Sequence, residues 1–105
     1  MLGKAMEADR RVVRVAGVFF DQLDAQLGTD RGPGGEPSAT DFLVLDLPVI
    51  VEHFATDFEG LPEIIDGVPQ ARMLITTGRL VRAFVVYGLL AADGSIDLIG
   101  VELDL

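Results

Sequence analysis

Residues 71–105 read ARMLITTGRLVRAFVVYGLLAADGSIDLIGVELDL, and this stretch decides the fold. Three runs rich in apolar and β-branched residues, at 71–76, 80–91 and 96–105, are separated by Thr77-Gly78 and Asp93-Gly94. β-branched residues favour strands, and such dipeptides favour two-residue hairpin turns. The last third of the chain is therefore predicted to form a three-stranded antiparallel meander.

Centring each dipeptide in its turn fixes a register for this meander. Thr76 then pairs with Arg79, Ala92 pairs with Ser95, and Tyr87 lies opposite Gly100, where an aromatic ring can cover a bare backbone. One face collects seven apolar residues, namely Met73, Ile75, Phe84, Val86, Ile99, Val101 and Leu103. The opposite face collects Leu74, Val81, Val85, Tyr87, Leu89 and Leu98, with Arg72, Glu102 and Asp104 toward one end.

The first third of the chain predicts one helix and a loop. Residues 18–27 carry apolar side chains at helical spacing and end before Gly28, a helix-stopping residue. The valine-rich residues 11–17 fit either a strand or the start of this helix. Residues 28–37 hold four glycines and two prolines, which predicts a flexible loop without a phosphate-binding motif.

A second helix is predicted in the middle of the chain. Ser38 to Asp41 resembles a capping box, and Pro48 follows Asp46, a second possible helix cap. Apolar residues then recur at helical spacing, which predicts a helix through Glu59. The elements combine into a single α+β domain over residues 1–105. Two helices pack on one face of a three- to four-stranded antiparallel sheet.

Composition excludes several classes of function. Seventeen acidic residues against eight basic ones give a net charge of −9, which argues against nucleic-acid binding by the chain itself. There is no cysteine and only one histidine, His53, so thiolate sites and a histidine-rich zinc site are excluded. The longest apolar run, 83–92, is too short to span a membrane. We expect a cytoplasmic protein without cofactor or metal.

Charged residues are segregated along the chain. Residues 37–71 contain seven acids and no Lys or Arg, which predicts a solvated acidic face rather than a catalytic carboxylate pair. Neither serine has the setting of a catalytic nucleophile, and no catalytic residue is assigned. Arg72, Arg79 and Arg82 are candidates for a patch that binds an anion or an acidic partner. The alternative is that they pair with the acids of the last strand.

Both faces of the predicted sheet are largely apolar, although an antiparallel sheet commonly leaves one face to water. Helices can cover one face, and the second face is covered either by a further helix or by another protein. The candidate interface is Leu74, Val81, Val85, Tyr87, Leu89 and Leu98. The leading hypothesis is a non-enzymatic protein-interaction domain, a homodimer or the binder of a small protein partner. A ligand pocket between the glycine-rich loop and the helices is a third hypothesis.

Four segments carry a topological resemblance to a known family, namely Phe19–Asp24, Arg72–Ile75, Val85–Tyr87 and Asp93–Leu98. Their order resembles the RelE/ParE-type bacterial toxin superfamily, with a first helix and a closing hairpin. The resemblance implies a toxin of a toxin–antitoxin pair as the second hypothesis. Members that cleave messenger RNA are basic, whereas this chain ends in Glu102-Leu103-Asp104-Leu105, so the ribonuclease site is not carried over.

Overall fold

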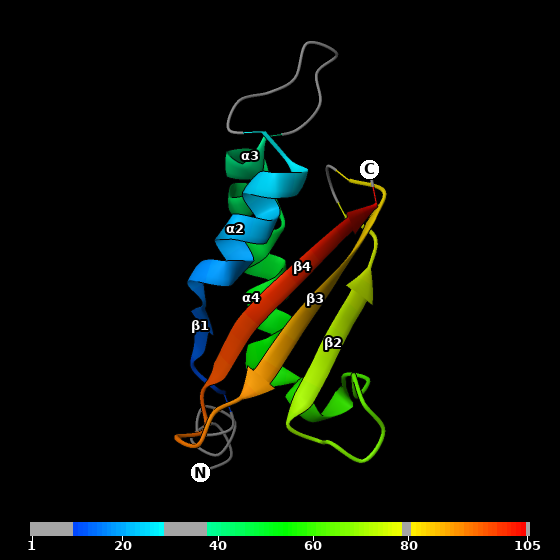
Figure 1. The fold of residues 1–105 in the computed structure, drawn as a ribbon. Coiled ribbons are helices and arrows are strands. Elements are labelled where there is room, and N and C mark those ends of the chain that lie inside the picture. The colour runs from blue at the N-terminus through cyan, green and yellow to red at the C-terminus, as the bar shows by residue number, and fades with distance from the viewer. Residues whose placement is uncertain (1–9, 29–37, 79–80, 105) are drawn as a thin grey trace.

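The computed structural model describes residues 10–28, 38–78 and 81–104. Within these ranges it contains four strands, three α-helices and one 3₁₀ turn (Figure 1). In chain order the elements are β1 (Val13–Val15), α2 (Gly17–Gln26), α3 (Ala39–Leu45), α4 (Leu47–Thr56), the 3₁₀ turn η1 (Phe58–Gly60), β2 (Ala71–Thr76), β3 (Ala83–Leu90) and β4 (Ile96–Asp104). Nearly all of the predicted glycine-rich loop, 29–37, lies outside the described residues.

The strands form one mixed sheet in the order β1-β4-β3-β2. β2, β3 and β4 are antiparallel neighbours, which is the predicted meander, whereas β1 pairs with β4 in parallel. The α+β class is confirmed, but the sheet is mixed rather than antiparallel, and three α-helices replace the two expected. The direction of β1 escaped prediction because it depends on a partner more than eighty residues away, not on local pattern.

Local signals place the helices. Residues 13–15 form a strand and the helix starts at Gly17, which resolves the two alternatives for 11–17. The Ser38 hydroxyl accepts from the Asp41 backbone N–H and the Asp41 carboxylate accepts from the Ser38 N–H, so the predicted capping box is present. The helix predicted through Glu59 ends instead at Thr56, and a 3₁₀ turn follows it.

The register of β3 with β4 follows the prediction over half of its length. Residues 83–87 pair with 100–104 as expected, and Tyr87 lies opposite Gly100. A β-bulge then shifts the register by one residue, so that Gly88 pairs with Leu98 rather than Ile99. The turn between β3 and β4 contains Gly94 at a φ of 88°, a backbone conformation that favours glycine.

The predicted register of β2 with β3 is wrong. The two-residue turn would pair Leu74 with Val81, but Leu74 pairs with Val86, because β2 ends at Thr76 and β3 begins only at Ala83. Val81 is buried in the connection between β2 and β3. Its side chain packs against Gly78, where a Cβ would lie 2.7 Å from Cγ2 of Val81. A shift of five residues is odd, so it exchanges the two faces of β2 relative to β3.

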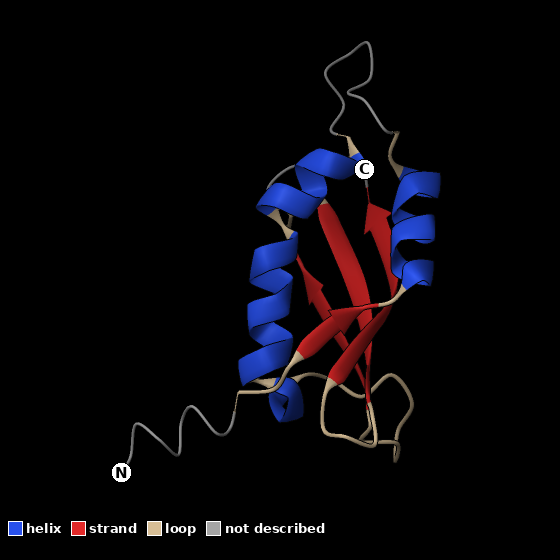
Figure 2. Cartoon of the chain, turned by 90° about the vertical axis from the view of Figure 1, so that its left-hand side faces the viewer, coloured by secondary structure: helices blue, strands red, loops and turns tan. Residues whose placement is uncertain are grey.

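The hydrophobic core lies between one face of the sheet and the helices. Figure 2 shows α3 and α4 following one another along this inner face. The largest fully buried side chains are Phe19, Phe42, Phe54, Phe58, Leu23, Ile50, Ile96, Leu98, Val86 and Val101. Phe42 meets Phe84 edge to face at a centroid distance of 5.5 Å, which ties α3 to β3.

Helix α2 lies beside β4 and closes its edge. β1 covers only residues 96–98 of β4, and the backbone groups of Val101 and Leu103 face the same side beyond the bulge. The Gln22 Oε1 accepts from the Val101 N–H at 2.9 Å. The Gln26 amide donates to the Val101 carbonyl at 2.8 Å and accepts from the Leu103 N–H at 2.7 Å. Two side-chain amides on successive turns of α2 therefore replace a neighbouring strand.

The first prediction concerns this edge. Gln26→Met keeps the size of the side chain but leaves the Val101 carbonyl and the Leu103 N–H without their amide partner. We expect the free energy of unfolding in urea to fall by about 1–3 kcal/mol, the cost of unmade hydrogen bonds at a part-buried site. Gln70→Met, at an exposed position, is the matched control and should unfold like the parent protein. Equal stability of the two variants would contradict the bridging role of Gln26.

A second prediction concerns the contact of α4 with the sheet. A Cβ at Gly88 would lie 2.5 Å from Cε1 of Phe54, so this glycine allows the phenyl ring to approach β3. Gly88→Ala should lower the free energy of unfolding by about 1–3 kcal/mol through overpacking. Gly17→Ala is the control, because nothing lies within 4 Å of its Cβ position. Thermal unfolding followed by circular dichroism separates the two, and a silent Gly88→Ala would contradict the tight contact.

Candidate functional site

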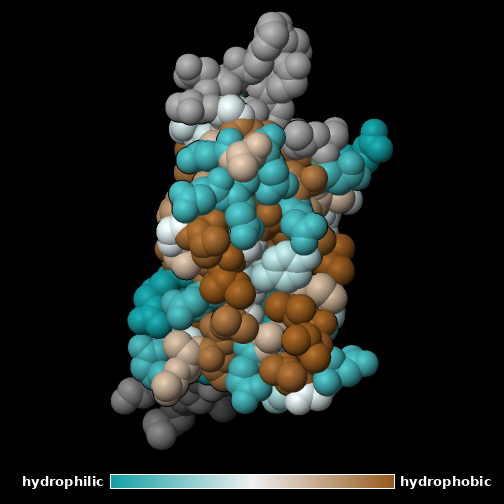
Figure 3. All heavy atoms as spheres, viewed as in Figure 1, coloured by the Kyte–Doolittle hydropathy of each residue, from teal (hydrophilic) through white to brown (hydrophobic). Residues whose placement is uncertain are grey.

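The sheet face turned away from α3 and α4, here called the outer face, carries a cluster of apolar side chains. Figure 3 shows apolar atoms gathered over the strands on this side. The paired residues Met73 with Tyr87 and Ile75 with Val85 form its centre, and Leu89 extends it. Ile75 is 58% exposed and Leu89 is 38% exposed. Exposed apolar side chains on adjacent strands are typical of an interaction surface.

A groove crosses the outer face between α2 and Tyr87, with a volume of about 610 Å³. Gln22, Ala25 and Gln26 form the α2 side, and Ile64, Tyr87, Ile99, Gly100, Val101 and Glu102 complete the lining. A Cβ at Gly100 would lie 3.2 Å from the Tyr87 ring, so the ring covers the glycine as the sequence predicts. The groove is therefore mostly apolar, with one carboxylate at its lining.

The single tyrosine is held in place by this carboxylate. The Tyr87 hydroxyl donates a hydrogen bond to the Glu102 carboxylate on the neighbouring strand β4. This hydrogen bond, with smaller contributions from burial and from the negative charge of Glu102, raises the pKa of the Tyr87 phenol above its usual value. The phenol therefore stays protonated and remains a donor. It fixes the ring over the glycine-lined floor of the groove.

The six predicted interface residues divide between the two faces. Val85, Tyr87 and Leu89 lie on the outer face, as the interface hypothesis requires. Leu74, Val81 and Leu98 are buried in the core instead. The longer connection after β2 turns Leu74 inward and removes Val81 from the strand, and the bulge reverses Leu98. The same shift brings Met73 and Ile75 to the outer face.

The three predicted patch arginines do not form an available patch within the described residues. The Arg72 guanidinium donates to the carbonyls of Glu59, Leu61 and Pro69 at 2.8–3.0 Å, and its side chain is only 11% exposed. It also lies 3.8 Å from Glu63 and over the Phe58 ring. Arg72 therefore fastens the segment between α4 and β2. Arg82 is exposed, and Arg79 lies outside the described residues.

Part of the acidic face is neutralised by arginines that precede α2. Arg10 forms a two-pronged pair with Glu52 of α4, at 2.7 and 2.8 Å, and Arg11 pairs with Glu59 at 2.5 Å. The hydrogen bond from Arg10 lowers the pKa of the Glu52 carboxyl, and burial opposes this only in part. These contacts join residues more than forty positions apart. The sequence offered no signal for them beyond opposite charge.

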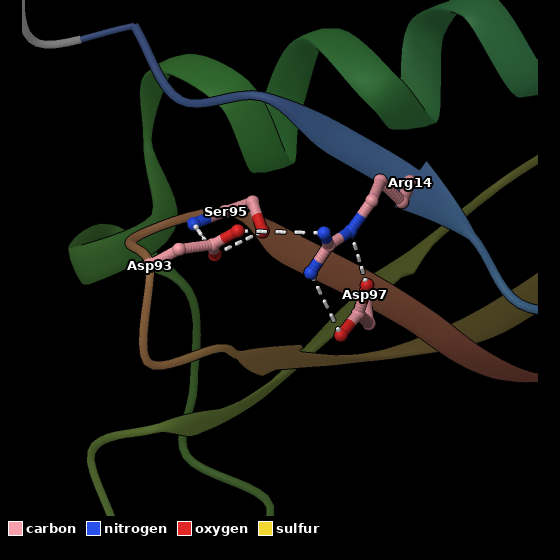
Figure 4. Close-up of polar contacts among 4 residues, drawn as sticks. All are labelled: Arg14, Asp93, Ser95 and Asp97. Atoms are coloured by element: carbon pink, nitrogen blue, oxygen red, sulfur yellow. Dashed lines mark hydrogen bonds and ion pairs between the residues drawn. The ribbon is translucent and has the colours of Figure 1, made fainter.

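A third arginine holds β1 to the last turn (Figure 4). Arg14 donates to Asp97 on the neighbouring strand at 2.9 Å and reaches Asp93 at 3.4 Å. The Asp93 carboxylate also accepts from the Ser95 hydroxyl and backbone N–H, and these bonds lower the pKa of its carboxyl. Ser95 thus closes the turn between β3 and β4 through its contacts with Asp93.

No catalytic arrangement is evident among the side chains that the structure places. Ser38 caps α3, Ser95 is bound to Asp93, and His53 lies on the exposed side of α4. Within residues 10–28, 38–78 and 81–104 no three His, Cys, Asp or Glu side chains are grouped to hold a metal ion. The outer face is therefore the strongest candidate site.

Comparison with family models, with curated proteins and with solved structures finds no match for this chain. In the part of the chain that the structure describes, no helix combines the length and the apolar character needed to cross a membrane.

The third prediction separates the roles of two arginines. Arg72→Lys removes the planar group that binds three carbonyls, so the free energy of unfolding should fall by about 1–3 kcal/mol. Arg82→Lys, the matched change at an exposed position of the same region, should leave stability unchanged. Urea unfolding measures both variants. Equal stabilities would show that Arg72 does not fasten the segment between α4 and β2.

Proposed function

We propose that the protein is an interaction domain that self-associates through the outer face of its sheet. One observation carries the proposal: α3 and α4 cover the inner face, whereas the outer face presents Ile75, Val85 and Leu89 to solvent and also contains a mostly apolar groove beside Tyr87. Removing apolar area from water contributes about 25 cal/mol per Å² toward association, and part of this gain is offset by the loss of translational, rotational and side-chain freedom. The outer face of a second molecule of the same protein can supply this apolar area, so no different partner protein is needed.

The distribution of charge also supports association at this face. The chain carries a net charge of −9, which disfavours contact between two copies over most of its surface. Residues 67–92, which contribute β2 and β3 to the outer face, contain no Asp or Glu. The acids of this face lie on β4, at Asp97, Glu102 and Asp104, and Glu102 is held by the Tyr87 hydroxyl. Two copies therefore meet with least repulsion over β2 and β3.

Contacts among the described residues give no support to the toxin-like alternative. Of the four side chains that could serve a ribonuclease role, Arg72 is bound to three main-chain carbonyls and Tyr87 donates to Glu102. Arg82 is exposed, and Arg79 lies outside the described residues. Arg72 and Tyr87 are therefore not presented to a substrate as an available acid, base or phosphate-binding group. The interaction domain is therefore the function that the geometry supports best.

The fourth prediction tests this proposal. The purified protein should elute as a dimer in size-exclusion chromatography with light scattering at about 50 μM. Val85→Glu places a carboxylate in the centre of the outer face and should shift the species to a monomer. Val49→Glu is the control, because Val49 is an exposed apolar residue of α4 on the other side of the molecule. A monomeric parent protein, or a Val85→Glu variant that stays dimeric, would contradict the proposal.

A further inference from the structure

The outer edge of β2 is only half covered. Residues 62–64 run beside its first half, where the Met73 N–H donates to the Pro62 carbonyl and the Ile64 N–H donates to the Ala71 carbonyl. These contacts show that Ala71 and Met73 direct their backbone groups away from β3. Because successive residues of a strand alternate in this respect, Ile75 directs its N–H and C=O to the same side.

Beyond Met73 this edge is open. Among the described residues none hydrogen-bonds to the outward N–H or C=O of Ile75, and the residue is 58% exposed. The opposite edge of the sheet differs, because Gln22 and Gln26 fill the corresponding positions of β4. An open strand edge with an apolar side chain is a template for pairing with another strand. The fold thus closes the part of β4 that β1 does not cover, and leaves a short acceptor on the edge of β2.

We propose that this edge pairs with the same edge of a second copy, β2 against β2 in antiparallel direction about a two-fold axis at Ile75. In that arrangement each Ile75 N–H donates to the Ile75 carbonyl of the other copy, which completes a hydrogen-bonded pair. The two Ile75 side chains also meet across the axis. The inference goes beyond association through the outer face, because it uses main-chain groups at the edge and joins the two sheets into one.

Three features favour a second copy as the occupant. The free donor and acceptor belong to one residue, so the edge complements itself under two-fold symmetry. The edge lies in the acid-free stretch 67–92, where two chains of charge −9 repel each other least. The segment 71–76 is rich in apolar residues and holds no proline, so its main chain is free to pair. The paired area is small, so we expect a weak complex with a dissociation constant of about a micromolar or higher.

Charge reversal at the two-fold axis is the decisive test. Ile75→Lys and Ile75→Glu each place like charges opposite one another at the edge, and each also puts a charge at the centre of the outer face. Each variant alone should therefore lose both contacts and be monomeric by sedimentation equilibrium at about 0.5 mM. Their equimolar mixture should recover a heterodimer, because Lys and Glu then face each other. Leu89→Lys, on the outer face away from this edge, is the matched control and should still pair through β2 at about 0.5 mM, because its Ile75 is unchanged. A mixture that stays monomeric overturns the β2 pairing.

Amide hydrogen exchange provides a second readout that needs no variant. The Ile75 amide should exchange more slowly as the protein concentration rises, because pairing protects it. The Met73 amide, already bonded to Pro62, should show no such dependence on concentration. An Ile75 exchange rate that is independent of concentration overturns the pairing. If Val85→Glu abolishes association while the Ile75 variants remain dimeric, association through the outer face is supported and edge pairing is overturned. If Val85→Glu remains dimeric while the Ile75 variants are monomeric, edge pairing is supported and association through the outer face is overturned.

Discussion

The main chain of β4 needs hydrogen-bonding partners on both sides, and much of the fold follows from how these are supplied. β3 satisfies one side, while β1 satisfies only residues 96–98 of the other. The bulge beside Gly88 turns the groups of Val101 and Leu103 toward α2, where two glutamine amides meet them. Because buried backbone groups are costly when unpaired, this requirement fixes α2 along the edge of the sheet and β1 ahead of it.

With α2 committed to the edge, α3 and α4 cover the inner face and no helix remains within the described residues to cross the outer one. Phe54 approaches β3 closely because Gly88 carries no side chain. Several arginines are likewise used within the fold: Arg10 and Arg11 reach acids of α4 and η1, and Arg72 binds carbonyls. The molecule therefore presents an apolar sheet face on an otherwise acidic chain, which is the basis for proposing self-association.

Sequence reasoning succeeded where interactions are local. The capping box at Ser38, the helix that ends before Gly28 and the pairing of Tyr87 with Gly100 all depend on residues close in the chain or on one short turn. It failed at β2, where the connection to β3 is longer than the Thr77-Gly78 signal predicts. Leu74 and Val81 were lost from the predicted interface to the core for this reason, because an odd shift in register exchanges the side chains of a strand between faces, and Leu98 was lost to the bulge in β4.

The sequence by itself determined the α+β class, the absence of acids from the first two strands of the meander and the excess of apolar residues over what one sheet face needs. Only the tertiary structure decided which of those residues stay exposed, that Arg72 is structural, and that β2 keeps an open edge at Ile75. The physical reason is that helix caps and turns are short-range, with their energies set by neighbours in sequence. Register, bulges and edge partners depend on backbone groups brought together from distant parts of the chain.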